Sequence, residues 1–251
     1  MKIEFHYTYI ITALGFALTG HFSNLLIFTS IIIIHECGHF IIAKINKLNT
    51  NKIIIYPYGG MVKLNTKINT SINKELLVAI SGVIFQTLYY ILIYILYQNG
   101  LIREYIFSLY KTYNYSILTF NLLPIYPLDG SKILTLLLSK ILPYNTVNKI
   151  NIVISISTLT FISFINYYTF NYTIILIVGV LLDNIIKYSK DIKHLLNRFM
   201  LERYLYNMSF KKTKKINKLT DMYKDKYHIL KENDSYITEK QALSHKFKGK
   251  I

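Results

Sequence analysis

The residues with the clearest capacity for chemistry are two histidines and a glutamate inside one apolar run. The chain reads His-Glu-Cys-Gly-His from His35 to His39. Residues four apart share one face of a helix, so His35 and His39 would point the same way, with Glu36 beside them. Two imidazoles at this spacing hold Zn²⁺, and the neighbouring carboxylate acts as a general base on water. We therefore predict one zinc ion per chain, with Glu36 as the catalytic base.

The surroundings of this motif favour a metal site over a solvated helix face. Isoleucines precede the motif, and Phe40 and two more isoleucines follow it. Ionisable groups inside such a run are costly and usually functional. Cys37 lies two positions from His35, on another side of the helix, so we interpret it as a packing residue and not a nucleophile. It is the only cysteine, which excludes an intramolecular disulfide.

A catalytic zinc ion usually has three protein ligands, so one more must come from elsewhere in the chain. Asp129 stands out because it follows a segment interrupted by Pro124 and Pro127. A broken helix at membrane depth survives only when buried in protein or facing a wet cavity. Asp129 then either binds the metal or caps the helix that continues after it. The pair of histidines lacking a third ligand favours the first interpretation.

The elements that must position these residues are apolar segments of membrane length. The first could instead be a signal peptide, and the fourth is long enough to be a broken helix. We expect an all-α polytopic membrane protein with a six-helix transmembrane core. The six segments are Phe5–Gly20, Phe22–Ile45, Glu75–Tyr97, Tyr105–Leu138, Val147–Tyr167 and Tyr172–Ile186.

Charge predicts the orientation of these spans. The formal net charge is +16, and most basic residues lie in inter-helix loops and in the tail. With six spans the basic stretches all fall on one side, which the positive-inside rule makes cytoplasmic. This distribution argues for contact with the lipid bilayer and against a nucleic-acid partner. The active site is then expected towards the cytoplasmic side of the cell membrane.

Two regions outside the spans have patterns of their own. In the first basic loop, two β-rich runs flank Gly59 and Gly60, which predicts a small membrane-associated β-hairpin or an ordered loop packed on the bundle. We divide the chain into a six-span core at residues 1–187 and a basic helical cytoplasmic tail at residues 188–251. Apolar residues at helical spacing follow Ser189, as in an amphipathic helix on the membrane or one packed on the core. Residues 209–251 are expected to form a helical extension or to remain partly disordered.

Together the two motifs resemble the site-2 family of intramembrane zinc metalloproteases, peptidase family M50. The resemblance rests on His35–His39 and on the segment Asn121–Gly130, and it extends to the hairpin turn at Pro57–Gly60. The basic stretch Arg198–Tyr204 is similar to one that follows the last span in the sporulation subgroup of that family. The likeness covers residues 1 to about 205.

The resemblance implies roles for several residues. Asp129 would be the third zinc ligand, and Asn121 would help to position the substrate near it. We add Pro124, Gly59 and Gly60 as substrate-binding candidates, because the hairpin offers an edge for an extended substrate strand. The substrate implied is a membrane-associated sigma-factor precursor of the sigma-K type, with inhibitory membrane proteins as further partners. An anti-sigma factor or other membrane protein is the alternative substrate.

The sequence departs from the family pattern in two places, and one other functional class fits the same ligands. The run from Ser81 to Gln86 replaces the Gly-Pro and Asn of many relatives, which leaves the role of Gln86 open. The tail after Tyr206 looks too short for a complete regulatory CBS domain.

A metal transporter or non-catalytic scaffold would use the same buried ligands, but a transporter should show a continuous polar path through several spans. No oligomeric state is predicted.

Overall fold

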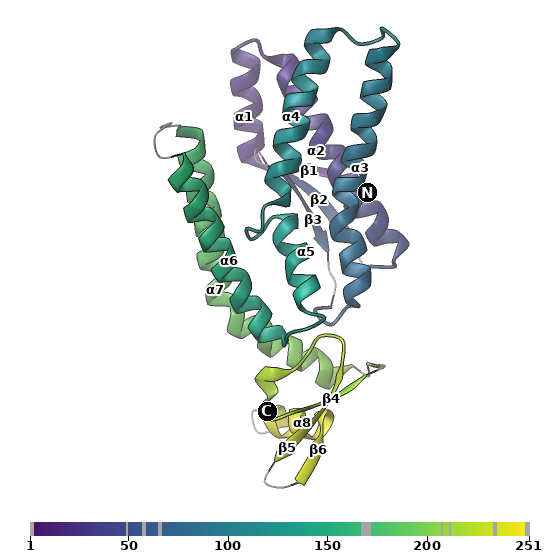
Figure 1. Ribbon diagram of the computed structural model, residues 1–251, viewed down its shortest axis with the longest axis vertical. Helices are drawn as coiled ribbons and strands as arrows, with labels where there is room; N and C mark the ends of the chain where they lie inside the picture. The colour runs from purple at the N-terminus through teal and green to yellow at the C-terminus, as the bar shows by residue number, and fades with distance from the viewer. Residues whose placement is uncertain are drawn as a thin grey trace. The chain divides into compact units, whose positions relative to one another are not determined.

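The computed structural model describes residues 3–48, 50–56, 59–64, 67–166, 172–206, 208–210, 212–232 and 235–248. These residues form two compact units (Figure 1). The first unit comprises Met1–Thr66 and Lys74–Leu122, and the second comprises Lys67–Asn73 and Leu123–Ile251. The expected hairpin turn at Pro57 and Tyr58 lies outside the described residues.

Four helices make up most of the first unit: α1 (Tyr7–Leu18), α2 (Phe22–Ile45), α3 (Ile72–Gln98) and α4 (Glu104–Leu122). Helix α2 lies against α1 and α4. Their shared core is formed by Tyr9, Ile31, Ile32, Phe40, Tyr110 and Ile117. Since α2 is also the helix that carries the His-Glu-Cys-Gly-His motif, this packing fixes the helix on which the site depends.

A small sheet completes the first unit, with the strand order β1 (Ile3–Phe5), β2 (Thr50–Tyr56) and β3 (Gly59–Leu64). Strands β2 and β3 are antiparallel, and the pair nearest the turn is Tyr56 opposite Gly59. The predicted β-hairpin is therefore present. Strand β1 pairs in parallel with β2, a contact that the sequence did not suggest. Both strands of the hairpin lie against α2.

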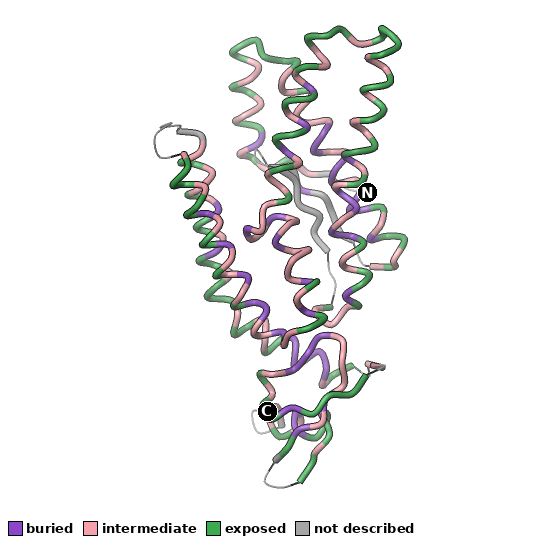
Figure 2. The backbone as a smooth tube through the Cα atoms, in the orientation of Figure 1, coloured by how far each residue is buried: buried purple, intermediate pink, exposed green. Residues whose placement is uncertain are grey.

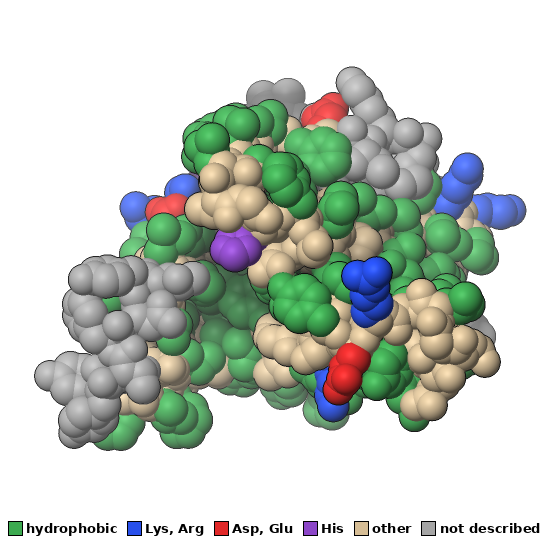
Figure 3. Space-filling view, turned by 90° about the horizontal axis from the view of Figure 1, so that it is seen from above, with side chains coloured by type: hydrophobic (Ala, Val, Ile, Leu, Met, Phe, Trp, Pro, Cys, Tyr) green, Lys and Arg blue, Asp and Glu red, His purple; other side chains and the backbone are tan. Residues whose placement is uncertain are grey.

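Three helices of the whole described chain are long and apolar enough to cross a membrane: α2, α3 and α6 (Tyr144–Ile165). Many large hydrophobic residues of the helices are exposed. Figure 2 shows exposed positions in green along these helices. Hydrophobic side chains are widespread and charged ones few on the face drawn in Figure 3. Exposed apolar surface on this scale is unfavourable in water and matches a lipid environment.

The larger part of the second unit follows the predicted helix break. Helix α4 ends at Leu122 and α5 (Asp129–Leu138) begins after the two prolines, so residues 123–128 interrupt the long apolar segment. Helix α6 then lies against both α5 and the 34-residue α7 (Tyr172–Leu205). The boundary expected at residue 187 falls inside α7, which continues without interruption into the basic region.

The tail, which we expected to be helical with its last part a helical extension or partly disordered, also contains strands. After α7 the chain forms a second three-stranded sheet, with strands β4 (Thr213–Ile216), β5 (Tyr227–Glu232) and β6 (Ser235–Thr238), followed by α8 (Glu239–Lys248). A 3₁₀ turn, η2 (Leu219–Asp221), precedes β5. In β5 alternate residues are buried, which is the period of a strand. The abundant lysines of this region hid that short pattern in the sequence.

The residues that follow Leu205 and the last turns of α7 form one folded part, which we call the C-terminal module (residues 196–248). Its core consists of Phe199, Met200, Ile216, Met222, Leu230 and Leu243 with their neighbours. Phe199 and Met200 are almost fully buried in it. The last turns of the helix that follows Ser189 therefore pack against the rest of this module.

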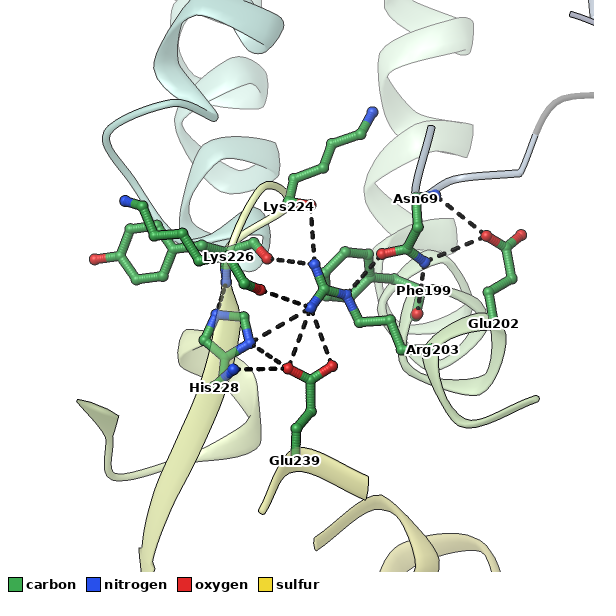
Figure 4. A network of polar contacts seen from close by, with 9 residues as sticks. Asn69, Phe199, Glu202, Arg203, Lys224, Lys226, His228 and Glu239 are labelled. Carbon is green, nitrogen blue, oxygen red and sulfur yellow. Dashed lines mark hydrogen bonds and ion pairs between the residues drawn. The ribbon is translucent and has the colours of Figure 1, made fainter. Parts of the chain in front are cut away.

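A buried polar network fixes the module (Figure 4). The guanidinium of Arg203 donates to Glu239 Oε1 at 3.0 Å and to the carbonyl of Tyr223 at 2.7 Å. Glu239 Oε2 in turn lies 2.7 Å from Nδ1 of His228, whose Nε2 accepts a hydrogen bond from the Tyr223 N–H at 2.9 Å. The Arg203 and Glu239 side chains are 1% and 5% exposed, so the charges neutralise each other away from water.

Candidate metal centre

Helix α2 brings His35, Glu36 and His39 together as the sequence predicted. All three are buried, and their potential ligand atoms lie within 4.8 Å of one another. The imidazole rings meet edge to face, with 4.8 Å between their centroids, and their Nε2 atoms are 3.1 Å apart. A single ion can therefore reach both rings and the carboxylate from one position.

The partner of His35 Nδ1 fixes the protonation of that ring. The Nδ1 atom lies 2.9 Å from Oε1 of Gln86 in α3. The amide group of Gln86 donates to both the backbone carbonyl and the side-chain Oδ1 of Asn114, at 3.0 and 3.1 Å. Because both of those partners are acceptors, the NH₂ group must face Asn114 and the oxygen must face His35. Nδ1 of His35 is then the donor, which leaves Nε2 to act as a ligand.

His39 is held in the same tautomer by the backbone. Its Nδ1 lies 2.7 Å from the carbonyl oxygen of Val78 in α3 and must donate to it. Both rings thus turn an Nε2 atom without an N–H group toward the other. In the neutral rings, two such nitrogens at 3.1 Å repel each other, and a shared proton or a bound cation relieves that repulsion. The donor set of two imidazoles and a carboxylate is one that zinc accepts.

Glycines make room at this position. A Cβ atom added to Gly82 would lie 2.6 Å from His35 Nε2 and would also collide with His39 Nε2. The α3 backbone therefore leaves open the space that both Nε2 atoms face. Gly38 lets α2 and α3 approach each other closely, since a Cβ atom there would lie 2.7 Å from the Ser81 carbonyl oxygen. Small residues allow this close approach of helices within a membrane, and the residues present fit a bound zinc ion.

The comparison with protein families decides the classification. The model of Peptidase family M50 matches residues 23–102 and 97–164, which include the whole histidine motif and Asp129. The chain belongs to peptidase family M50. Together with its three long apolar helices, this membership makes it an integral membrane protein.

Two relatives give the M50 assignment more detail. The chain is 36% identical over 153 residues to stage IV sporulation protein FB of Bacillus subtilis (strain 168). That match covers 61% of this chain but only 53% of the relative, so the chain spans about half the length of that protein. The structure is similar to the site-2 protease of Methanocaldococcus jannaschii, with a TM-score of 0.59 and 25% identity over 74% of this chain and 90% of that one.

The other predicted site residues of this M50 chain fall in both units. Asn121 lies in the last turn of α4, and Gly59 and Gly60 begin β3, all in the first unit with the histidines. Pro124 and Asp129 belong to the second unit, where Asp129 is the half-buried first residue of α5. Its role as third ligand therefore stays a prediction.

Three residues near the histidines had no assigned role in the sequence. Gln86 is fully buried, and Asn114 is 3% exposed beside it. Gly82 borders both Nε2 atoms. One signal in the sequence points to them: Gln86 and Asn114 are uncharged polar residues inside apolar helices, where each must find a partner. Spacing alone could not reveal that their partners include each other and His35.

Proposed function

We propose that this chain is a zinc-dependent intramembrane endopeptidase that hydrolyses a membrane-associated protein. The observation that carries the proposal is the pair of Nε2 atoms facing each other at 3.1 Å, with the Glu36 carboxylate beside them on an apolar helix. A zinc ion bound there would polarise the scissile carbonyl and lower the pKa of water. Membership of a peptidase family supports the same chemistry.

Each residue then has a distinct task. His35 and His39 hold the ion, and Asp129 supplies the third ligand. Glu36 accepts a proton from the attacking water and returns it to the leaving amine, so no covalent intermediate is required. Asn121 and Pro124 contact the substrate near the site, and the edge of the sheet at Gly59 and Gly60 holds the substrate backbone in an extended form.

Replacement of Glu36 by Gln tests the reaction. The amide cannot take up the proton, so we expect peptide cleavage to fall by at least about 10²-fold, the lower range for a lost general base. Zinc content should stay near one ion per chain, because both imidazoles remain. The measurement is cleavage of a membrane substrate by purified protein in liposomes, with and without a chelator. Normal turnover by Glu36→Gln, or cleavage that survives chelation, would contradict the proposal.

Asp129→Ala tests the third ligand separately. Loss of one of three ligands should weaken zinc binding by more than tenfold, whereas loss of a helix cap alone costs roughly 1 kcal/mol of stability and leaves the metal in place. Zinc affinity from chelator competition, measured beside thermal stability, distinguishes the two roles. Unchanged affinity would remove Asp129 from the metal centre.

For the substrate we propose a membrane-associated sigma-factor precursor of the sigma-K type, cut during sporulation. The similarity to stage IV sporulation protein FB supports this choice. A six-span core with the basic loops and tail in the cytoplasm would release the product there. Co-expression with the precursor should shorten it, and Glu36→Gln should prevent the shortening. Cleavage of a co-expressed anti-sigma factor instead would identify the alternative substrate.

A further inference from the structure

We propose that Gln86 and Asn114 form a hydrogen-bonded relay that fixes the tautomer and orientation of the metal ligand His35. The relay runs from α2 through α3 to α4, from His35 Nδ1 to Gln86 and from Gln86 to Asn114. It makes Gln86 and Asn114 positioning residues of the metal centre. The inference rests on the proposed function only in taking the ion to be zinc.

Burial gives the relay its strength. His35, Gln86 and Asn114 are 2%, 0% and 3% exposed, so water cannot replace a lost partner. A buried donor left without an acceptor is strongly unfavourable. Without Gln86, the Nδ1–H of His35 would face an apolar surrounding, and the ring would lower its energy by turning or by moving its proton to Nε2. Either change removes Nε2 from the position in which it meets His39.

Asn114 determines which way Gln86 points. An amide flipped by 180° would offer its NH₂ group to His35 and would force the proton onto Nε2, where it blocks a metal. The two acceptors of Asn114 oppose that flip, because they would then face the Gln86 oxygen. One of them is the backbone carbonyl, which no substitution removes. Loss of the Asn114 side chain should therefore matter less than loss of Gln86.

The two histidines differ in how they can be tested. His39 is oriented by the backbone carbonyl of Val78, which stays in place in any variant. His35 depends on a side chain, so its orientation can be changed without touching a metal ligand. Groups that hydrogen-bond a metal-bound histidine commonly contribute 10–100-fold to metal affinity. The relay should contribute on this scale.

The test compares zinc affinities of purified full-length protein in detergent, measured by chelator competition. Gln86→Leu keeps the approximate volume and removes the acceptor, and we expect binding 10–100-fold weaker. Gln86→Glu keeps an acceptor for His35 but loses the NH₂ group that faces Asn114, so it should bind zinc more tightly than Gln86→Leu. Asn114→Ala should weaken binding by a few-fold. A purely structural role for Gln86 predicts equal losses in the Leu and Glu variants, and that result would overturn the relay.

A second readout follows the ligand geometry directly. With Co²⁺ in place of Zn²⁺, the visible absorption spectrum should change in Gln86→Leu and remain near wild type in Gln86→Glu. Thr87→Val is the matched control, since Thr87 is the next residue of α3 and its exposed hydroxyl bonds only within the helix, to the Val83 carbonyl. It should leave affinity and spectrum unchanged. If Gln86→Leu does not fold, Gln86→Met removes the same acceptor, and an unchanged zinc affinity in that variant rejects the relay.

These results remain separable from the proposed function. Zinc affinity and the Co²⁺ spectrum are measured without a substrate, so a wild-type protein that binds zinc but cuts nothing fails the proposed function and still tests the relay. Conversely, an active wild-type enzyme whose Gln86→Leu variant binds zinc equally well rejects the relay and leaves the peptidase in place.

Discussion

Two buried histidines of this chain, His35 and His228, differ in what their second nitrogen meets. Each is no more than 2% exposed, and each bonds through Nδ1 to a side-chain oxygen, of Gln86 and of Glu239 respectively. In the C-terminal module, the Nε2 of His228 accepts a backbone N–H, so the protein itself completes the ring's hydrogen bonds. In α2, the Nε2 of His35 faces the Nε2 of His39.

The difference shows how a structural histidine can be told from a ligand. Burial and a carboxylate or amide partner are common to both, so neither property marks a metal site. The distinguishing feature is a ring nitrogen that faces a second ring nitrogen, since a bound cation can be shared by such a pair. The pair in α2 has this feature, whereas His228 does not. The predictions below test whether the two regions respond differently to matched changes.

The largest effect should come from filling the space beside the histidine pair. In Gly82→Ala the added methyl group would lie against both Nε2 atoms. We expect zinc content to fall from about one ion per chain to near zero, with loss of cleavage. Gly15→Ala in α1 is the control, because nothing lies within 4 Å of its added Cβ. Wild-type zinc content in Gly82→Ala would mean that the ion does not lie where the Nε2 atoms meet.

A smaller effect is expected when the buried ion pair of the C-terminal module is broken. Arg203→Met leaves the Glu239 carboxylate without its cation, which should cost about 3–5 kcal/mol of local stability. Arg198→Met makes the same change one helical turn earlier, where the side chain is 60% exposed and pairs with Glu202, and should cost less than about 1 kcal/mol. Backbone amide exchange in β5 measures both. Zinc affinity should not change in either variant; a large loss would contradict the separation of the two regions.

The sequence predicted the parts of the site that depend on neighbours along the chain. The spacing of His35 and His39 places both on one helical face, and the two prolines before Asp129 predict the helix break. The sequence did not predict the roles of Gly82, Gln86 and Asn114, because these roles depend on how α3 and α4 pack against α2. Hydropathy predicts that these helices exist but not which polar residues meet across them.

The same limit explains the error in the tail. Strands β4 to β6 are four to six residues long, and the alternate burial of His228 and Leu230 is confined to β5. So short an alternation is hard to recognise in a sequence rich in lysine. The apolar residues Phe199 and Met200, by contrast, continue the longer helical pattern of α7. The polar network around Arg203 joins residues far apart in the sequence and left no local signal.

The smallest predicted effect is a pH dependence confined to the C-terminal module. Burial lowers the pKa of His228 below its ordinary value of 6.5. Burial alone would raise the pKa of Glu239, but the hydrogen bond from His228 and the charge of Arg203 lower it below 4.5. Both groups therefore take up protons more readily in the unfolded chain, so stability falls as the pH drops below about 6.5 and again below about 4.5.

Protection factors of the β5 amides, measured between pH 8 and pH 5, test the first of these steps. Protection should be constant above pH 7 and should decrease toward pH 5, because protonated Nε2 of His228 would face the Tyr223 N–H as a second donor. In His228→Gln, which cannot titrate, the decrease should disappear even if the module is less stable at every pH. A decrease that persists in His228→Gln would assign it to another group and would leave His228 as a packing residue with no part in the pH response.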